Sequence, residues 1–567
     1  MLHSSISGNI VDITNRKIFS GTIHISGRSI EKIDRTGEEN ISLPYILPGF
    51  VDSHVHIESS MMVPSEFARL AVVHGTVATI SDPHEIANVC GLEGVEYMIE
   101  NGKQVPFKFY FGAPSCVPAT TLETAGASID ARQVESLLAR PEIKYLSEMM
   151  NFPGVLFNDP EVMQKIAAAQ QHHKPIDGHA PGLRGEAAAT YIRGGQKEGP
   201  VVISTDHECF TKEEALDKLQ HGMKILIREG SAAKNFEALI DLLHDYPDQI
   251  MFCSDDKHPD SLVENHLNII CKRAVAKGID VFHVLQAACI NPVKHYHLEV
   301  GLLQPNNPAD FILVKDLKSF DVLSTYINGQ KVAEQGKSLI ASVPVTPINQ
   351  FDCAPVSRKE LAFKLDEIVK SEDGKSVPII EALEGQLITN QLNIPMDVFS
   401  VEEDCLLADT TKDLLYMVVV NRYQPAPVAK CFVRNFGLKR GAIASSVAHD
   451  SHNIIAVGTD MTSLERAINL IIQSQGGVST VLPNESTDQF EEVVVPLPVA
   501  GLMSDRDGYE VAETYGAADQ LSKKTGSPLA APFMTLSFMA LLVIPYLKLS
   551  DKGLTICDEK GIRIIDQ

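Results

Sequence analysis

The sequence lacks any Cys-x-x-Cys pair, although it contains ten cysteines. They are scattered singly, at positions that include Cys90, Cys116, Cys209, Cys253, Cys289 and Cys431. A disulfide-stapled secreted domain or a zinc ribbon needs paired, closely spaced cysteines, so both classes are excluded. Isolated thiols suit a reducing compartment, and residues 1–6 lack the basic and then apolar stretch of a secretion signal. We therefore expect a cytoplasmic protein.

Long apolar runs and positive charge are also scarce. The longest apolar tract, residues 533–544, ends at Pro545 and is too short to span a bilayer, so we expect a buried core element there. Lys and Arg number 49 against 73 Asp and Glu, which gives a net charge of −24. Such a charge repels phosphate, so nucleic acid and membrane surfaces are not expected partners, whereas a small neutral substrate is compatible.

The 567 residues are too many for one core, and two distant stretches look alike. Short runs at 10–13, 21–25 and 29–33 alternate apolar and polar residues, with Gly and Asn turns between them. Similar runs return at 309–314 and 322–329. We predict that residues 1–47 and 301–345 form one small composite β-domain, with a larger domain inserted between them.

The inserted region, residues 48–300, has a regular rhythm of an apolar run, a polar cluster and usually a helix-like segment. The eight runs cover residues 49–56, 76–82, 107–112, 145–148, 175–179, 201–207, 224–229 and 250–255. Helices are predicted over 159–172, 211–221 and 260–276. This alternation predicts a (β/α)8 TIM-type barrel. A doubly wound open sheet is the alternative, but the glycine fingerprint that usually follows its first strand is absent.

Residues 346–567 form a further region, predicted as a C-terminal α/β domain. An apolar strand-like run covers 414–420, and a helix-like segment covers 461–473. The complete fold prediction is thus an α/β protein in which a (β/α)8 barrel is inserted in a small composite β-domain and followed by a C-terminal α/β domain.

Ionisable residues cluster at the carboxyl ends of the predicted barrel strands, where barrel enzymes build their active sites. His54 and His56 are two apart, so both imidazoles point to the same side of a strand and form half of a divalent metal site. The residues at the ends of the later strands are Asp82, His84, Glu148, His179, His207 and Asp255. Their common position on successive strands predicts one site.

The ligand types are chemically consistent. Histidines together with carboxylates, and without a thiolate, suit zinc, iron(II) or manganese. Glu148 could bridge two ions, since a carboxylate has two oxygens. Cys253 and Asp255 share one face of the last strand and Asp256 takes the other, so we expect Asp255 to point inward, with Asp256 as the alternative.

Three further groups leave alternatives open. Asp82, His84 and Glu85 could contact substrate, relay a proton, bind a further metal, or support the first ligands through hydrogen bonds. Arg228 could hold the edge of a substrate or form a salt bridge at the barrel rim. The remaining group lies far along the chain and could form a lid over the barrel mouth or stabilise a turn; its members are His449, Asp450 and His452.

The order of these residues resembles the amidohydrolase superfamily, in which His-x-His on strand 1 is followed by a bridging acid, two histidines and an aspartate. The matching positions are His54, His56, Glu148, His179, His207 and Asp255. Residues 48–60, 81–88, 177–183, 254–260 and 448–455 are similar to the adenine deaminase family within it. The likeness runs nearly the full length, and Glu148 stands where many binuclear members carry a carboxylated lysine.

The resemblance implies hydrolysis of adenine, a purine base, to hypoxanthine and ammonia, with a place in purine salvage and a homodimeric assembly. It implies two divalent ions, manganese or iron(II) first and zinc as an alternative, held by the six matching residues. Asp255 would move protons, Glu148 would hold the ions together, and His84 would take part in catalysis. From their own positions at the strand ends, and apart from the resemblance, we expect Asp82 and Arg228 to contact the substrate.

Two rival functions remain on the same scaffold. One is a hydrolase of cyclic amides, of the hydantoinase or dihydropyrimidinase kind, which opens a ring and releases no ammonia. The other is a non-enzymatic assembly protein, which would have lost ligands, whereas every expected ligand is present. The zinc deaminases that carry a Pro-Cys-x-x-Cys signature are excluded, because no such cysteine pair exists.

Overall fold

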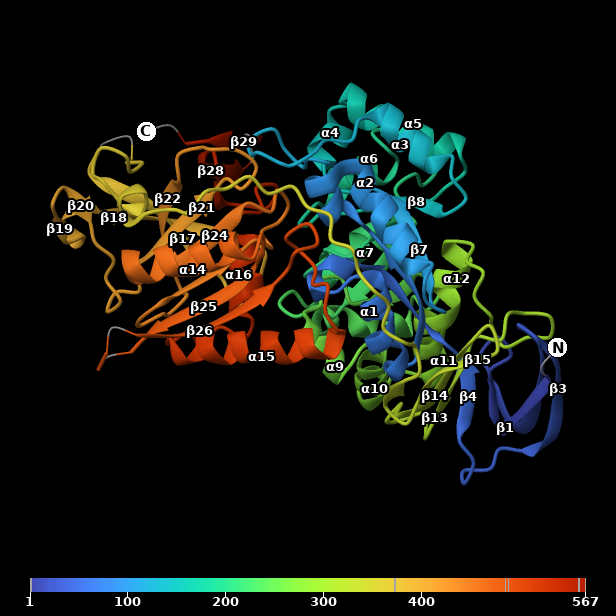
Figure 1. Cartoon of the computed structure of the whole chain (residues 1–567). Coiled ribbons are helices and arrows are strands. Elements are labelled where there is room, and N and C mark those ends of the chain that lie inside the picture. The colour runs from blue at the N-terminus through green and yellow to red at the C-terminus, as the bar shows by residue number, and fades with distance from the viewer. Residues whose placement is uncertain (1–2, 372–373, 485, 488, 559–560, 566–567) are drawn as a thin grey trace.

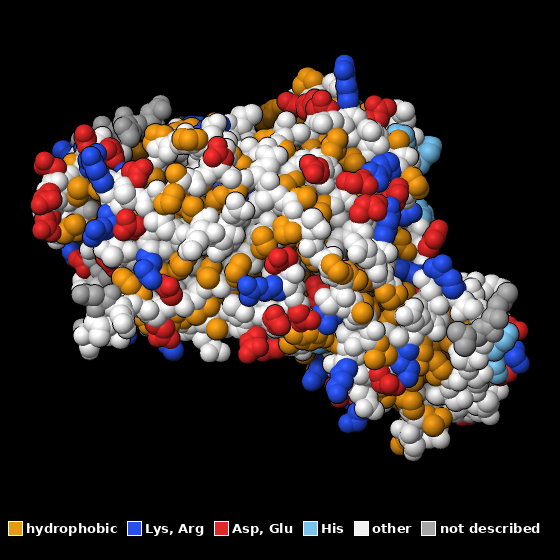
Figure 2. Space-filling model, viewed as in Figure 1, with side chains coloured by type: hydrophobic (Ala, Val, Ile, Leu, Met, Phe, Trp, Pro, Cys, Tyr) orange, Lys and Arg blue, Asp and Glu red, His pale blue; other side chains and the backbone are white. Residues whose placement is uncertain are grey.

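The computed structural model of the chain describes residues 3–371, 374–484, 486–487, 489–558 and 561–565. Over these residues the strands form three eight-stranded sheets, one two-stranded sheet and one three-stranded sheet. Figure 1 shows the barrel between two flanking parts, the small β-domain that carries the N-terminus and the orange C-terminal sheet. Acidic and basic side chains are interspersed over the face in Figure 2, so neither sign gathers into one large patch there.

The first sheet joins strands from both sides of the barrel segment, as predicted. Its order is β16-β15-β14-β13-β4-β1-β2-β3. The central contact pairs β4 with β13 antiparallel, with Pro48 opposite Phe311, so residues far apart in sequence lie in neighbouring strands. The strand bounds are β1 His3–Asp12, β2 Lys17–Ser26, β3 Ser29–Glu38, β4 Tyr45–Pro48, β13 Phe311–Val314, β14 Val322–Ile327, β15 Gln330–Glu334 and β16 Lys337–Ser338.

The second sheet is the predicted parallel barrel, in the order β12-β11-β10-β9-β8-β7-β6-β5. A parallel bridge between Val55 and Asp255 brings its two ends together, and Asp255 N donates to His54 O over 2.9 Å. The strands are β5 Phe50–Val55, β6 Thr76–Ser81, β7 Lys108–Ala113, β8 Ile143–Met149, β9 Ile176–Gly178, β10 Thr205–Asp206, β11 Lys224–Arg228 and β12 Ile250–Cys253. Every residue of β5 and β6 is buried, as expected for strands of a parallel sheet that is covered on both faces.

Two local predictions in the barrel were wrong. The strand predicted over 201–207 is reduced to β10, because the amides of Val202 and Ile203 both donate to Ile192 O and satisfy the end of the preceding helix. The helix predicted over 260–276 is split into α9 (Pro259–Glu264) and α10 (Leu267–Ala276). Between them the buried His266 binds Thr76 and Asp52 of the barrel, which pulls the chain out of helical geometry.

The other helices around the barrel cover its outside. Side-chain caps start several of them, and Asp159 accepts from Glu161 N and Val162 N at the helix predicted near that position. Their bounds are α1 Pro64–Ala71, α2 His84–Gly102, α3 Ala131–Leu138, α4 Phe152–Leu156, α5 Pro160–Gln171, α6 Gly185–Ile192, α7 Lys212–Gln220, α8 Phe236–Leu239, α11 Val281–Leu285 and α12 Asn291–His295.

The C-terminal region contains the third sheet, in the order β18-β17-β22-β21-β24-β23-β25-β26. Its strands are β17 Ser376–Ala382, β18 Thr389–Pro395, β21 Leu415–Val420, β22 Ala429–Arg434, β23 Ala442–Ser445, β24 Ile454–Gly458, β25 Gly477–Pro483 and β26 Phe490–Pro496. Smaller strands are β19 Val401–Glu402, β20 Cys405–Leu406, β27 Leu547–Ser550, β28 Gly553–Asp558 and β29 Gly561–Ile564. The helices are α13 Arg358–Leu361, α14 Met461–Gln473, α15 Gly508–Lys524 and α16 Pro532–Phe538, so the helix predicted over 461–473 is confirmed.

The apolar tract at 533–544 is buried, as predicted. All seven residues of α16 are buried, and most of the tract belongs to the core shared with the barrel. In the described part of the chain, no helix combines the length and the apolar character needed to cross a membrane.

The C-terminal region packs directly against the barrel. Ser504 N donates to Met61 O over 2.9 Å, and Arg69 Nη1 contacts Asp507 Oδ2 at 2.6 Å. Figure 1 shows α15 next to α9 at this boundary. The C-terminal region therefore borders the face of the barrel where the strands end. The domain boundaries at 47, 300 and 345 stay a prediction.

Candidate metal centre

The predicted ligands come together at the carboxyl ends of the barrel strands. His54 lies in β5, Glu148 lies in β8, and the others directly follow β5, β6, β9, β10 and β12. All are buried, with 6% or less of each residue exposed: His54, His56, Asp82, His84, Glu148, His179, His207 and Asp255. The alternation of apolar strand and polar turn thus delivers these side chains to one place.

His54, His56 and Asp255 form the first group. His54 Nε2 lies 3.1 Å from His56 Nε2. Asp255 Oδ1 lies 3.3 Å from His56 Nε2 and 3.6 Å from His54 Nε2. Three potential ligand atoms therefore point at one spot. Asp256, the alternative to Asp255, lines the same cavity.

Glu148 connects this group to a second one. Its Oε1 lies 3.3 Å from His56 Nε2. Its Oε2 lies 2.8 Å from His179 Nδ1 and 3.2 Å from His207 Nε2. Each oxygen of one carboxylate thus faces a different set of imidazoles, which is the arrangement that a bridging ligand needs.

The electrostatics of the group fit cation binding. Burial lowers the pKa of His54 well below its usual value, so this imidazole is neutral and offers a lone pair. Burial raises the pKa of Glu148, but the charge of His179 and hydrogen bonds to the imidazoles outweigh it and hold the carboxyl ionised. Imidazole nitrogens and ionised carboxylates without a thiolate form a donor set for manganese, iron(II) or zinc, and an imidazole that binds a cation does so in its unprotonated form.

Arg228 and Glu208 lie behind the first group. The guanidinium of Arg228 pairs with both oxygens of Glu208, with Nη2 to Oε2 at 3.0 Å, and Nη1 also contacts Asp255 Oδ2. Burial raises the pKa of Asp255, but the charge of Arg228 outweighs it and holds the pKa well below its usual value. The ion pair anticipated for Arg228 is present, although it is buried rather than exposed at a rim.

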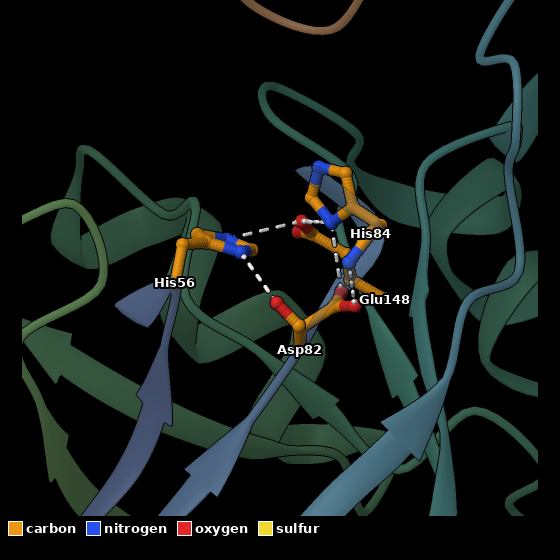
Figure 3. A group of neighbouring side chains, drawn as sticks. All are labelled: His56, Asp82, His84 and Glu148. Atoms are coloured by element: carbon orange, nitrogen blue, oxygen red, sulfur yellow. Dashed lines mark hydrogen bonds and ion pairs between the residues drawn. The ribbon is translucent and has the colours of Figure 1, made fainter. Parts of the chain in front are cut away.

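Asp82 and His84 form the second cluster that the sequence suggested. Figure 3 shows the imidazoles of His56 and His84 turned toward the Glu148 carboxylate, with Asp82 beside them. His84 Nδ1 lies 3.1 Å from Asp82 Oδ2 and 3.5 Å from Glu148 Oε1. Burial lowers the pKa of His84, but Asp82 and Glu85 outweigh it and raise the pKa well above its usual value. His84 lines the cavity, whereas Asp82 is not among the described residues that line it.

The C-terminal region completes the site. Glu85, from α2, hydrogen-bonds through one carboxylate oxygen to His449 and through the other to His452. The cavity over the predicted ligands has a volume of about 20 Å³, and five C-terminal residues help to line it: Leu387, His449, Asp450, Phe538 and Leu541. The histidine cluster borders the barrel mouth, and it also holds its own turn, because Ala448 N donates to His452 Nδ1 over 3.2 Å.

Sequence reasoning missed several residues of the site. Glu208 directly follows His207, so alternation along an extended strand would turn its side chain away from the site. The strand β10 ends at Asp206, however, and alternation does not apply beyond that residue. Leu387, Phe538 and Leu541 carry no local signal, because apolar residues are ordinary core residues until the distant segment they pack against is known.

His449 is expected to stabilise the contact with α2 in a pH-dependent way. Burial lowers the pKa of His449, but the charge of Glu85 outweighs it and raises the pKa to about 9. Because the pKa is higher in the folded than in the unfolded chain, protonation of His449 stabilises the folded state. This stabilisation is complete at pH values below the pKa of an unfolded histidine, near 6.5, and it disappears as the pH rises through about 9. His449→Gln should therefore lose on the order of 3 kcal/mol of unfolding free energy at pH 6 and little at pH 10.

Denaturant unfolding of the full chain at both pH values measures this difference. His74→Gln is the matched control, because burial lowers the pKa of His74 to about 4 and the side chain is neutral over the whole range. A loss for His449→Gln that is equal at pH 6 and pH 10 would contradict the ion pair.

Comparisons with known proteins give a consistent result. The model of the amidohydrolase family matches residues 45–332, and the model of the adenine deaminase C-terminal domain matches residues 386–560. An adenine deaminase of Sulfurovum sp. (strain NBC37-1) is 54% identical over 565 residues, which cover 99% of both chains. Adenine deaminases of Salinibacter ruber and Methanosarcina acetivorans are 49% and 50% identical, and each alignment covers at least 96% of both chains.

Proposed function

The chain belongs to the adenine deaminase family of the amidohydrolases, and from this premise we propose that it hydrolyses adenine to hypoxanthine and ammonia at a two-metal centre. One observation carries the two-metal assignment. The two oxygens of Glu148 face two separate groups of imidazoles, with His56 on one side and His179 and His207 on the other.

The residues divide into two ligand sets around Glu148. His54, His56 and Asp255 would hold one ion, and His179 and His207 would hold the other. Manganese or iron(II) suits this nitrogen and oxygen donor set, with zinc as the alternative. When bound, two such ions lower the pKa of water and supply hydroxide at neutral pH.

Asp255 moves the protons of the reaction. A bond forms between the water oxygen and C6 of adenine, and the bond from C6 to the exocyclic amine breaks. Asp255 takes the proton that the water loses and passes it toward the ring nitrogen or the departing amine. Because Arg228 binds Oδ2, the oxygen Oδ1 stays turned toward His54 and His56, where the water reacts.

His84, Asp82 and Arg228 bind and orient the base. His84 lines the cavity and would donate a hydrogen bond to the ring as negative charge develops on it, and Asp82 fixes the orientation of the imidazole. Arg228 also lines the cavity, and its Nε has no hydrogen-bond partner among the described residues. That free donor supports a contact with the purine edge.

We also propose a cytoplasmic homodimer that serves purine salvage. The ten cysteines of the chain are all free in the structure, which suits a reducing compartment. The dimer and the salvage role follow from the family.

Metal dependence is the direct test of the proposed function. Dialysis against a chelator is expected to abolish ammonia release from adenine, and addition of manganese or iron(II) under anaerobic conditions is expected to restore it. Stopped samples analysed for hypoxanthine and ammonia in equal amounts measure the reaction. A fully metal-loaded protein that leaves adenine unchanged would refute the substrate.

The same assay separates the rival function. A cyclic-amide hydrolase would open dihydrouracil or hydantoin without releasing ammonia. Full-length similarity to adenine deaminases does not favour that alternative. Turnover of a cyclic amide at a rate that exceeds adenine turnover would reverse this preference.

A further inference from the structure

We propose that Asp450 selects the free purine base by accepting its N9–H, and that apolar residues of the C-terminal region exclude bases substituted at N9. The inference rests on the proposed function and extends it to the choice between base and nucleoside. It assigns a substrate-binding role to a segment that lies outside the barrel.

Two sets of side chains from different parts of the chain line the cavity. The barrel supplies the predicted metal ligands, such as Glu148 and Asp255. The C-terminal region supplies Leu387 between β17 and β18, Asp450 between β23 and β24, and Phe538 at the end of α16. A planar ligand held between the two parts presents one edge to each.

The chemistry orients the purine between these two edges. C6 is the reacting atom, so it faces Glu148 and Asp255. N9 lies at the opposite end of the bicyclic ring system and therefore faces the C-terminal region. In a free base N9 carries a hydrogen, whereas in a nucleoside it carries the sugar.

Asp450 offers an acceptor at that end. Its side chain is 3% exposed, and Oδ2 has no hydrogen-bond partner in the part of the chain that the structure describes. The other oxygen, Oδ1, lies 3.9 Å from His84 Nε2, which keeps the carboxyl at the cavity. A buried acceptor without a donor is unfavourable, and a ligand N–H at this place would satisfy it.

Apolar side chains close the space around Asp450. Phe538 packs against the His449 ring at 5.3 Å between centroids, and Leu387 and Phe538 are each buried to at least 97%. Lys548 Nζ donates to the carbonyls of Leu387 over 2.6 Å and Phe538 over 2.9 Å, which ties these two segments together. The cavity is narrow, at about 20 Å³, so a base would enter only if the cover moved outward, and a sugar at N9 would require a larger displacement of these apolar side chains than the base alone.

The hydrogen bond to N9–H is expected to give a large ratio between the kcat/KM values for the free base and for a base substituted at N9. A site built around a substrate N–H rejects an analogue that lacks it by about 10⁴-fold, because the buried acceptor is then left without a partner. Apolar contacts alone discriminate far less. Asp450 therefore contributes most of the selection, and the cover of Leu387, Phe538 and Leu541 adds to it.

The experiment compares kcat/KM for adenine and for 9-methyladenine, which lacks only the N9–H and adds one methyl group. In the metal-loaded full chain the ratio is expected to exceed about 10³. Asp450→Ala should lower kcat/KM for adenine by about 10²-fold and leave that for 9-methyladenine unchanged or higher, so the ratio falls below about 10². Asp450→Leu keeps the branched shape without an acceptor and should give the same fall if the alanine variant does not fold.

Asp551→Ala is the matched control. Asp551 is a buried carboxyl of the same region that accepts from Asn421 Nδ2 and Thr124 N, and it does not belong to the described cavity lining. The ratio should stay at the wild-type value. A wild-type ratio near one, or an Asp450 variant that retains both its metal and the wild-type ratio, overturns this inference alone. Failure of the wild-type protein to deaminate adenine would instead overturn the proposed function.

Discussion

Replacement of Glu148 by glutamine is expected to remove about one metal equivalent per chain and to lower kcat/KM for adenine by at least about 10³-fold. Glutamine has the same shape but only one oxygen, so it can face either His56 or the pair His179 and His207. Its amide nitrogen would point at the other group and cannot act as a ligand. Elemental analysis of the purified protein measures the metal loss directly.

Glu66→Gln is the control for this substitution. Glu66 is also buried, at 1% exposure, and it is ion-paired with Arg69, yet it does not line the described cavity. Its glutamine variant should keep both metal equivalents. Two full equivalents in the Glu148 variant would mean that Glu148 is not the bridge.

The barrel could be predicted from the sequence because its signals are local. Each strand is a short apolar run, and the polar residues that follow it mark its carboxyl end. All eight predicted strands appear in order in one parallel sheet. The strand predicted over 201–207 shows the limit, because Val202 and Ile203 bind the end of α6 rather than a neighbouring strand.

Asp255 lies beside His54 and His56, but alternation along a strand does not explain why. The prediction assumed that side chains alternate along an extended strand that continues through residue 255. The strand β12 ends at Cys253, however, and Asp255 has a φ of 53°. Its side chain reaches the imidazoles because the backbone amides and carbonyls of His54, His56 and Asp255 join β5 to the end of β12. Such closure depends on residues about 200 positions apart, which no local pattern reveals.

The C-terminal contribution could not be predicted for the same reason. His449 and His452 bind Glu85 across more than 360 residues of sequence. The sequence suggested a lid or a turn for this cluster without a way to choose. Only the packing of the C-terminal region on the barrel shows that Asp450 and Phe538 border the same cavity as Glu148.

The second large effect is expected at Asp255. Asp255→Asn should keep both metal equivalents but lower kcat by about 10²- to 10⁴-fold, the usual range for loss of a proton-transferring group. Asparagine retains an oxygen that can face His54 and His56, so the ligand role survives in part. It cannot accept and release a proton, and its amide leaves Arg228 with only Glu208 as an ionised partner.

Asp177→Asn separates proton transfer from a general disturbance of the barrel. Asp177 is buried in β9, accepts from Thr205 and Tyr296, and is outside the cavity lining that the structure describes. Burial raises the pKa of Asp177 to about 7, so a neutral amide is a mild change there.

A kcat for Asp255→Asn within tenfold of the wild type would assign proton transfer to another group. Loss of metal from that variant would instead make Asp255 mainly a ligand. The combination of full metal content and a slow chemical step is the outcome that only the proton-transfer role predicts.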